Sequence, residues 1–323
     1  MQLDVFNGDA DGIIALLQLR LADPKESIRI TGVKRDINLL ARVLDTVDLA
    51  TISQVAVLDI SYEKNQQALQ TLLAKNIEVF YVDHHRSGNI SSHPKLNTLI
   101  NTDANVCTSL LVNDYLGGKY PFWAIAAAFG DNLIARAQAF AKQQGLSVTQ
   151  TAQLRELGTY INYNGYGRTV DDLHFHPANL FELLLNYENP FDLICEKNSL
   201  FTQLKTAYQQ DMTKAKSADI VYENSHCQII KLSDHAWARR VSGVLGNYLA
   251  NQAPDKAHAI LTLNNEGTYT VSVRAPLNNK QGADELCSKF PSGGGRAAAA
   301  GINQLSQKDL AAFIKTMSEY YTN

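Results

Sequence analysis

Residues 3–12, LDVFNGDADG, join a short apolar stretch to a turn that carries two aspartates. The stretch Leu3–Phe6 predicts a short strand, and the apolar-rich segment Gly12–Leu21 predicts a helix. Asp9 and Asp11 therefore fall where a strand gives way to a helix. A strand followed at once by a helix is how a βαβ unit begins.

The first half of the chain repeats this alternation. Strands are predicted at residues 27–33, 55–58 and 77–82, and helices at residues 37–44 and 63–75. Elements of these lengths in this order favour parallel strands, and continuous apolar strands fit a sheet that is covered on both sides. We therefore expect an α/β fold whose N-terminal parallel sheet has helices on both faces.

The rest of the chain changes character twice. Residues 107–141 read as mainly helical, residues 160–176 as a loop, and residues 177–216 as mostly helical with a break at Pro190. The last third predicts strands at 219–224 and 227–232, a helix at 236–249, a hairpin of 259–263 and 268–274, a glycine-rich turn with a helix, and a closing helix at 310–321. The expected organisation is a catalytic domain at 1–185, a helical connector at 186–217 and a smaller C-terminal α/β domain at 218–323.

Composition narrows the class of protein. The 323 residues are 45% hydrophobic and 19% charged, which is a globular balance, and the net charge of −3 lacks the basic excess of proteins that grip long nucleic acid. The four cysteines form no CxxC pair, so we expect free thiols in a reducing compartment. The acidic N-terminus is unlike a secretory signal, and the apolar run Trp123–Phe129 is too short to cross a bilayer, so we expect a cytoplasmic protein without a membrane partner.

Acidic residues and histidines follow several of the predicted elements. The first strand runs into Asp9 and Asp11, the third into Asp59, and the fourth into Asp83-His84-His85, while an apolar helix ends at Gly130-Asp131. The carboxyl ends of parallel strands lie at one edge of a sheet, where function gathers, so we expect these side chains to converge. Several carboxylates in one crevice need cations, and carboxylate with imidazole suits Mn²⁺ or a similar divalent ion.

Each residue also has a plain structural explanation. Asp9 could be a helix N-cap or turn residue, and Asp59 could simply open the next loop. For Asp9, Asp59 and Asp131 taken singly this explanation is favoured. The adjacent pair His84-His85 after a strand and an aspartate is harder to explain in this way, and the joint placement favours a metal site.

The same residues carry a resemblance to a known family. Gly8-Asp9-Ala10-Asp11-Gly12, Asp59, Val82-Asp83-His84-His85 and Gly130-Asp131 resemble the four motifs of the DHH phosphoesterases. Further on, the segment 292–301, SGGGRAAAAG, is similar to the glycine-rich signature of the associated DHHA1 domain. The motifs stand in the family's order and span nearly the whole chain.

The resemblance implies two divalent ions, usually Mn²⁺ with Mg²⁺ or another ion open, bridged by a water or hydroxide. Carried over to this chain, Asp59 would bridge both ions, Asp9 would bind one, and Asp11, His84 and Asp131 the other. Asp83 would orient a histidine, and His85 would face the scissile phosphate.

The chain departs from the family at the first ion. Many relatives carry a histidine four residues before the first aspartate, where this chain has Val5, which cannot coordinate a metal. The exonuclease branch uses an aspartate two residues before it, where this chain has Asn7. We expect Asn7 or water to complete a looser site for the first ion.

The C-terminal domain is expected to select the substrate. Gly293, Gly294 and Gly295 would let backbone N–H groups approach a phosphate or base, although a close packing turn explains a glycine triplet equally well. Relatives typically carry histidine where this chain has Arg296, whose guanidinium suits phosphate or the O6/N7 edge of guanine. Ser272-Val273-Arg274 resembles the family's strand-borne arginine that meets substrate phosphate, and a solvated salt bridge is the alternative for Arg274.

These features favour an Mn²⁺-dependent phosphodiesterase acting on short linear nucleotides rather than long nucleic acid, with hydrolysis of pGpG to two GMP as the leading hypothesis. A nanoRNase, pAp phosphatase or short single-strand exonuclease of broader specificity is one alternative. A pyrophosphatase or polyphosphatase is a second, and a nucleotide-binding regulator without catalysis is a third. Relatives often pair through the first domain, so the resemblance leaves a homodimer open.

Overall fold

The structure is a computed structural model that describes residues 1–264 and 266–322. The chain divides into two compact units, Met1–Thr206 and Ala207–Asn323. The division falls within the segment expected to connect two domains. Each unit has its own sheet and its own buried core.

The first unit is built on a five-stranded parallel sheet in the order β2-β1-β3-β4-β5. The strands are β1 (Gln2–Phe6), β2 (Ser27–Ile30), β3 (Gln54–Leu58), β4 (Glu78–Asp83) and β5 (Leu96–Ile100). The first four confirm the predicted strands, whereas β5 lies in a segment for which no strand was predicted. After β2 the chain crosses back to pair β3 on the other side of β1. Such a reversal of strand order opens a crevice at the carboxyl ends of the strands.

The register aligns those carboxyl ends. Phe6 pairs with Leu58, and Leu58 pairs with Val82. The residues that follow the three strands therefore begin at the same edge of the sheet, which is what brings Asp59 close to the Asp83-His84-His85 segment.

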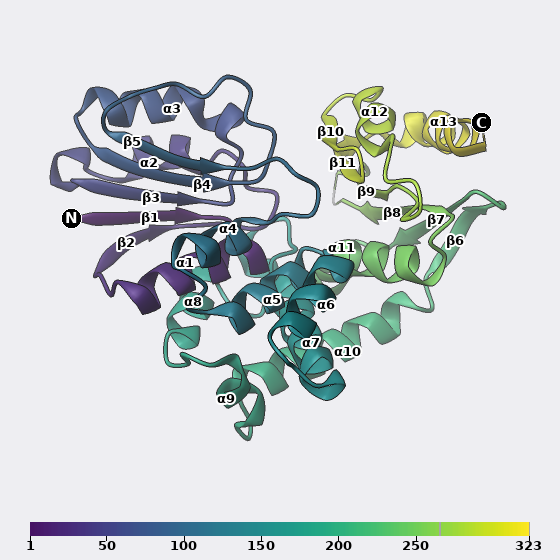
Figure 1. The fold of residues 1–323 in the computed structure, drawn as a ribbon. Helices are drawn as coiled ribbons and strands as arrows, with labels where there is room; N and C mark the ends of the chain where they lie inside the picture. The colour runs from purple at the N-terminus through teal and green to yellow at the C-terminus, as the bar shows by residue number, and fades with distance from the viewer. Residues whose placement is uncertain (265, 323) are drawn as a thin grey trace. The chain divides into compact units, whose positions relative to one another are not determined.

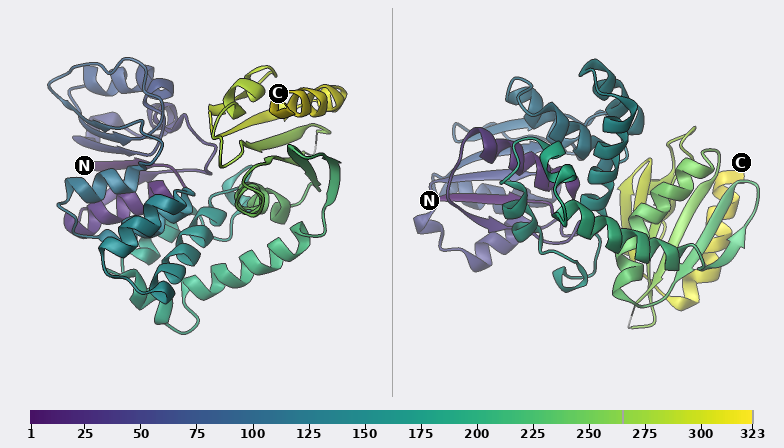
Figure 2. Two further views of the ribbon diagram at one scale, coloured as in Figure 1. Left: turned by 45° about the vertical axis from the view of Figure 1, so that its right-hand side comes forward. Right: turned by 90° about the horizontal axis from the view of Figure 1, so that it is seen from below.

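Helices cover both faces of this sheet, as predicted (Figure 1). On one face, α2 (Leu39–Thr46) and α3 (Tyr62–Ala74) pack on an apolar core that includes Leu3, Val57 and Tyr81. On the other face, α1 (Ala10–Ala22) contacts β1 and β3 and is itself covered by α4 (Thr108–Tyr115), so it is buried from Ala10 to Arg20. The left view of Figure 2 shows the same order of layers in this unit.

A helical group completes the first unit. Its members are α5 (Pro121–Gly130), α6 (Ile134–Gln143), α7 (Val148–Asn164), α8 (Pro177–Leu184), α9 (Pro190–Cys195) and α10 (Leu200–Ala215), which continues into the second unit. Pro190 begins α9, in line with the predicted break. The prediction of a loop from residue 160 was wrong for its first five positions, because α7 extends to Asn164 and buries most of that turn against its neighbours.

The second unit contains a six-stranded mixed sheet in the order β10-β11-β9-β8-β7-β6. Among its described residues, β7 and β8 pair in parallel and the other neighbouring strands pair antiparallel. Its strands are β6 (Asp219–Glu223), β7 (Cys227–Leu232), β8 (Ala257–Leu263), β9 (Tyr269–Arg274), β10 (Gly293–Arg296) and β11 (Ala299–Leu305). The helix α11 (Ala236–Gln252) covers one face, and α12 (Ala283–Ser288) and α13 (Leu310–Thr322) cover the other (Figure 1). The predicted hairpin of β8 and β9 is confirmed, although Asn265 of its connection lies outside the described residues.

Three short 3₁₀ helices, Leu49–Thr51, Val170–Asp172 and Gln307–Asp309, complete the secondary structure of the described residues. Within these same residues, no helix combines the length and apolar character needed to cross a membrane. The cytoplasmic location expected from the sequence stays a prediction.

Candidate metal centre and phosphate-binding residues

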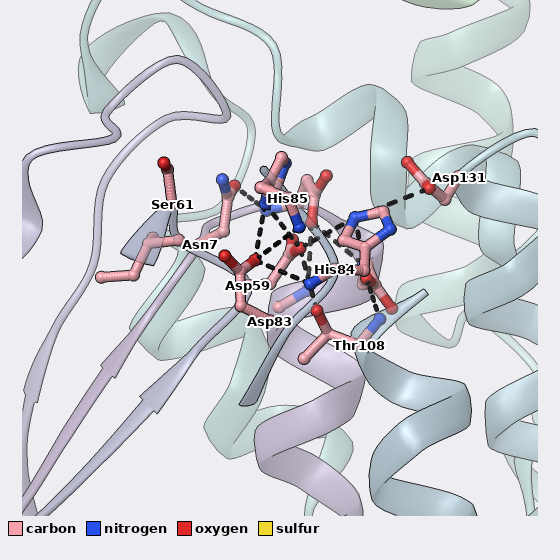
Figure 3. Close-up of polar contacts among 12 residues, drawn as sticks. Asn7, Asp59, Ser61, Asp83, His84, His85, Thr108 and Asp131 are labelled. Atoms are coloured by element: carbon pink, nitrogen blue, oxygen red, sulfur yellow. Dashed lines mark hydrogen bonds and ion pairs between the residues drawn. The ribbon is translucent and has the colours of Figure 1, made fainter. Parts of the chain in front are cut away.

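Three side chains meet where β3 and β4 end. Asp59, His84 and His85 each offer one ligand atom, and these atoms all lie within 4.8 Å of one another. Figure 3 shows both imidazoles close to the Asp59 carboxylate. Asp59 and His84 are buried, whereas 30% of the His85 side chain is exposed. The convergence expected from the strand ends is therefore present in the folded chain.

His84 is held so that one nitrogen faces the carboxylates. Its Nδ1 lies 2.8 Å from the carbonyl oxygen of Val106, and a carbonyl can only accept, so Nδ1 carries the proton. Nε2 lies 3.3 Å from Asp59 Oδ1, 3.8 Å from Asp11 Oδ2 and 3.9 Å from Asp131 Oδ2. In the neutral ring, Nε2 presents a lone pair to three carboxylates, which is the arrangement of a metal-ligating histidine.

Asp83 orients the segment that carries both histidines. Its Oδ1 accepts hydrogen bonds from the backbone N–H of His84 at 2.9 Å and of His85 at 3.2 Å. The same oxygen lies 2.7 Å from His85 Nδ1, and Oδ2 accepts from the N–H of Tyr62 at 3.1 Å. The carboxylate thus fixes the His85 ring with Nδ1 toward Asp83 and leaves Nε2 on the far side of the ring.

Asp11 is held by the first turn of α4, a contact that the sequence did not reveal. The backbone N–H groups of Thr108 and Ser109 donate to its two oxygens, each at 2.7 Å. A helix N-terminus favours an anion, because its amides lack partners within the helix. The predicted start of a helix at residue 107 indicates free backbone N–H groups near Thr108. Nothing in the sequence indicates which carboxylate would accept their hydrogen bonds.

Asp59 has a backbone and an electrostatic environment that are both unusual. Its φ is +58°, a left-handed conformation that non-glycine residues rarely adopt and that concentrates at functional sites. The hydroxyl of Thr108 donates to Oδ1 at 3.1 Å. Burial raises the pKa of Asp59 well above its ordinary value, and the charges of Asp11 and Asp9 raise it further. Burial likewise raises the pKa of Asp11.

Asp9 differs from Asp11 and Asp59 because it forms a close ion pair with a lysine. Oδ1 caps α1 by accepting from the N–H groups of Asp11 at 3.0 Å and Gly12 at 3.1 Å, as the structural explanation for Asp9 anticipated. Oδ2 forms an ion pair with the ammonium of Lys34. Burial raises the pKa of Asp9, but the attraction to Lys34 outweighs it and brings the pKa to about 2.

Lys34 was missed in the sequence, although it follows β2 in the same way that the other site residues follow their strands. Its Nζ also lies 3.8 Å from Asp131 Oδ1. Burial lowers the pKa of Lys34, yet the charge of Asp9 dominates and holds it above its ordinary value. The ammonium is therefore a standing positive charge on the Asp9 side of the site.

Asn7, expected as a ligand of the first ion, makes two hydrogen bonds inside the site. Its Oδ1 accepts from the N–H of Asp9 at 3.2 Å, and its Nδ2 donates to the backbone carbonyl of Lys34 at 3.2 Å. Val5, four residues before Asp9, is fully buried in the apolar core.

The donor set fits a divalent ion on the side of Asp11, Asp59, His84 and Asp131. Three carboxylates and the Nε2 of one imidazole approach each other there, and oxygen with imidazole nitrogen suits Mn²⁺ and similar ions rather than soft metals. The pKa values of Asp59 and Asp11 are raised first by burial and then by neighbouring carboxylates, and a bound cation favours the charged forms that burial and repulsion disfavour.

Arg274, expected to meet phosphate, is at the end of β9 in the second unit. Its Nε donates to Asn247 Oδ1 at 2.6 Å, and Nη1 donates to Ser272 Oγ at 3.0 Å and to the Val273 carbonyl at 3.1 Å. These contacts fix the guanidinium in place. All of these acceptors are neutral, which differs from the salt bridge that was the alternative.

Arg296 lies in the same cross-strand row. Arg274 pairs with Ala299, and Ala299 pairs with Arg296, so all three side chains share one face of the sheet. Two strand spacings separate the arginine backbones by roughly 10 Å, and the residue between them is the small Ala299. Arg296 is exposed.

The glycine triplet, expected in a turn, forms most of strand β10, so the expected turn was wrong. A Cβ at Gly293 would lie 1.9 Å from the Cys287 carbonyl oxygen, and one at Gly295, whose φ is +149°, would lie 2.4 Å from Ala300 Cα. Close packing therefore explains Gly293 and Gly295. Only Gly294 has open space beside it, with nothing within 4 Å of a Cβ, and it is the position at which a ligand could approach the backbone.

The structure thus places the sequence-predicted residues in two groups. Asn7, Asp9, Asp11, Asp59, Asp83, His84, His85 and Asp131 converge in the first unit, and Arg274, Gly293, Gly294, Gly295 and Arg296 lie on neighbouring strands of the second.

Comparison with solved structures identifies the fold of this chain, whereas the two sequence comparisons found no match. No protein-family model matches the sequence, and no curated protein matches it either. Among solved structures, RecJ from Thermus thermophilus in complex with Mn²⁺ is similar at a TM-score of 0.62 and 15% identity, over 99% of this chain and 52% of that one. This chain therefore spans about half the length of that RecJ.

Two further structures are similar over most of both chains. An exonuclease RecJ bound to manganese has a TM-score of 0.60 and 17% identity, over 100% of this chain and 90% of that one. The pGpG-specific phosphodiesterase PggH from Vibrio cholerae has a TM-score of 0.56 and 14% identity, over 99% of this chain and 98% of that one. Together with the strand order and the two-unit architecture, these similarities show that the chain has the fold of the DHH phosphoesterases.

Proposed function

We propose that this protein is a divalent-metal-dependent phosphodiesterase that hydrolyses short linear nucleotides, with pGpG, cleaved to two GMP, as the leading substrate. The observation that carries the proposal is the convergence of Asp59, His84 and His85 at the ends of β3 and β4, with Asp11 and Asp131 around the same imidazole. Several buried carboxylates in one place need a cation to offset their negative charge. Carboxylates and imidazoles are also the groups that hold metal ions in enzymes that act on phosphate.

Asp11, Asp59, His84 and Asp131 would hold one divalent ion, and Asp9 with Asn7 would face a second. Mn²⁺ is the expected ion, with Mg²⁺ as the main alternative. When bound, such an ion supplies Lewis-acid chemistry, which lowers the pKa of water and stabilises charge on phosphate.

The protein's own groups would prepare the site for that chemistry. The Val106 carbonyl holds the proton of His84 on Nδ1, so Nε2 stays available. Asp83 holds His85 at 2.7 Å, and the partly exposed ring can reach a substrate phosphate through its other nitrogen. A proton on that nitrogen would be donated to a phosphoryl oxygen, and Asp83 would stabilise the positive charge that the ring carries while it holds that proton.

Arg274 and Arg296 would bind the nucleotide in the second unit. A guanidinium pairs with phosphate through two parallel hydrogen bonds, and it pairs equally well with O6 and N7 of guanine. Arg274 is already fixed by Asn247 and Ser272, which suits a phosphate contact, whereas the exposed Arg296 suits base selection. The similarity to a pGpG-specific phosphodiesterase over nearly the full length of both chains favours the same substrate class.

The net charge of the chain supports a short substrate. Binding a long strand requires many lysines and arginines, because each neutralised phosphate contributes to affinity. The net charge of this chain is −3, so a substrate with two or three phosphates matches it better than a long polymer does.

The test is product analysis with the purified full-length chain and Mn²⁺ over a panel of pGpG, pApA, pAp, a longer single strand and pyrophosphate. We expect GMP from pGpG at the highest rate, and none from the Asp59→Asn variant. Equal rates on pGpG and pApA would remove the preference for guanine. Turnover of pyrophosphate alone would replace the phosphodiesterase by a pyrophosphatase.

A further inference from the structure

The ammonium of Lys34 lies inside the carboxylate cluster, and nothing in the resemblance assigns it a role. It is paired with Asp9 Oδ2 and lies 3.8 Å from Asp131 Oδ1. It also donates to Asn162 Oδ1 at 3.3 Å and lies 5.7 Å from the centre of the Tyr166 ring. Carboxylate, amide oxygen and an aromatic face are all favourable neighbours of a cation, so the pocket is built around a positive charge.

The backbone of Lys34 is fixed at both of its polar groups. Its N–H donates to the Gly165 carbonyl at 2.8 Å, and its carbonyl accepts from Asn7 Nδ2 at 3.2 Å. Asn7 in turn accepts from the N–H of Asp9 at 3.2 Å. Asn7 therefore ties the Lys34 backbone to the turn that carries Asp9, and the lysine side chain starts from a defined position.

Asp9 has both oxygens engaged in this arrangement. Oδ1 accepts two backbone N–H groups at the start of α1, and Oδ2 is paired with the lysine. Val5, on the strand that leads to Asp9, has an apolar side chain without a donor atom. A divalent ion bound to Asp9 would have to displace the Lys34 ammonium or lie directly beside it. Two positive charges in contact repel strongly in a buried site.

On the other side of the cluster, Asp11 and Asp59 have no lysine at ion-pair distance among the described residues, and Asp131, whose Oδ1 lies 3.8 Å from the Lys34 ammonium, turns its Oδ2 toward His84. His84 Nε2 faces Asp59, Asp11 and Asp131 at 3.3 to 3.9 Å. Asp11 accepts backbone amides at its two carboxylate oxygens, and Asp59 accepts a neutral hydroxyl, so these contacts bring no counter-charge. A divalent ion should therefore bind more tightly on the side of Asp11, Asp59 and His84 than on the side of Asp9.

We propose that Lys34 is the resident cation of the Asp9 side, so that the centre binds one divalent ion tightly at Asp11, Asp59, His84 and Asp131 and a second at least a hundredfold more weakly. This inference rests on the metal centre of the proposed function and changes its stoichiometry. Asn7 acts in it as a positioning residue for Lys34 rather than as a metal ligand.

The test is a titration of the metal-stripped full-length protein with Mn²⁺, in which the electron paramagnetic resonance signal of free Mn²⁺ reports the ions bound. The wild type is expected to take up one ion, with a dissociation constant for the second at least a hundredfold higher. In Lys34→Met the second ion should bind at least tenfold more tightly than in the wild type. Lys34→Arg keeps the charge and should resemble the wild type.

Two ions bound by the wild type with dissociation constants within tenfold of each other would overturn the proposal, whatever the variants do. An unchanged or weaker second ion in Lys34→Met, with a circular dichroism melt like that of the wild type, would also overturn it and make Lys34 a structural ion-pair partner. A wild type that binds no Mn²⁺ would instead remove the metal centre itself, and with it the proposed function.

Discussion

The Nδ1 atom of His84 lies 2.8 Å from the carbonyl oxygen of Val106, on the side of the ring away from the carboxylates. This contact decides which nitrogen can bind a metal, because His84 Nδ1 carries the proton that it donates to the Val106 carbonyl, which leaves the lone pair on Nε2. The neighbouring His85 is fixed in a different way, since its Nδ1 faces Asp83. Two adjacent histidines are therefore prepared for two different tasks.

The first prediction separates those tasks. His84→Ala should weaken Mn²⁺ binding by about 10- to 100-fold or more, because it removes a ligand atom. His85→Ala should leave Mn²⁺ binding within about threefold of the wild type and lower kcat by roughly 10²- to 10⁴-fold, the range of a lost proton donor. Metal titration and steady-state kinetics on the same preparations check both. Equal losses of Mn²⁺ affinity in the two variants would contradict the division.

The second prediction concerns the pH dependence of stability without metal. Because the pKa of Asp59 is raised by burial and by Asp11 and Asp9, the folded chain keeps a proton there that the unfolded chain has lost. The resulting stabilisation is complete below the ordinary carboxyl pKa and is lost as the pH rises through the raised value. In chelator, the wild type should melt at lower temperatures as the pH rises from about 5 to about 8.

Asp59→Asn is the matched variant for this effect. It cannot ionise, so its melting temperature should depend less on pH and should exceed that of the wild type by a few degrees at about pH 8. Mn²⁺ should stabilise the wild type, because a bound ion needs the ionised carboxylate, and should have little effect on the variant. A variant that is less stable than the metal-free wild type across the whole range would contradict the raised pKa.

The third prediction tests the glycine triplet. Gly295→Ala should destabilise the protein by about 1–3 kcal/mol, because φ is +149° and the new Cβ would meet Ala300. Gly294→Ala should change stability by less than about 0.5 kcal/mol, since there is open space beside it, yet it should raise KM if a ligand approaches the backbone there. Denaturant unfolding and kinetics of the two variants provide the comparison. Unchanged KM in Gly294→Ala would leave the triplet with a packing role alone.

The fourth prediction concerns Arg296. The exposed side chain of Arg296 contributes little to stability, so Arg296→Gln should unfold like the wild type. If it reads guanine, the ratio of kcat/KM for pGpG over pApA should fall by about 5- to 150-fold, which corresponds to about 1–3 kcal/mol for one bidentate base contact. An equal loss on both substrates would assign Arg296 to phosphate instead.

Much of the first unit could be predicted, because its strands are continuous apolar runs and its site residues directly follow them. Val55–Leu58 and the strand before Asp83 needed no tertiary information. By contrast, β5 has the sequence LNTLI at the sheet edge, with no fully buried residue, and its pattern was too weak to recognise. The end of α7 was missed because Tyr, Asn and Gly disfavour a helix locally, whereas packing against α5 overrides that preference.

The sequence predicted most of the residues of the candidate site. It did not predict the hydrogen bonds and ion pairs that hold them in place. Asp9, Asp59 and His84 follow from the strand-end rule alone. The rule applies equally to Lys34 after β2, but a single lysine in a loop carries no signal until the fold places it beside Asp9. The amides of Thr108 and Ser109 reach Asp11 across 97 and 98 positions of the chain, and a contact of that range has no local signature.

The most direct test of the account is the cleavage of the nucleotide panel by metal-stripped protein, measured with and without added Mn²⁺ for the wild type and Asp59→Asn side by side. The account predicts that mononucleotides appear only when the wild type and Mn²⁺ are both present, and that chelator stops their release. Cleavage that persists in chelator, or that proceeds undiminished in Asp59→Asn, would contradict it.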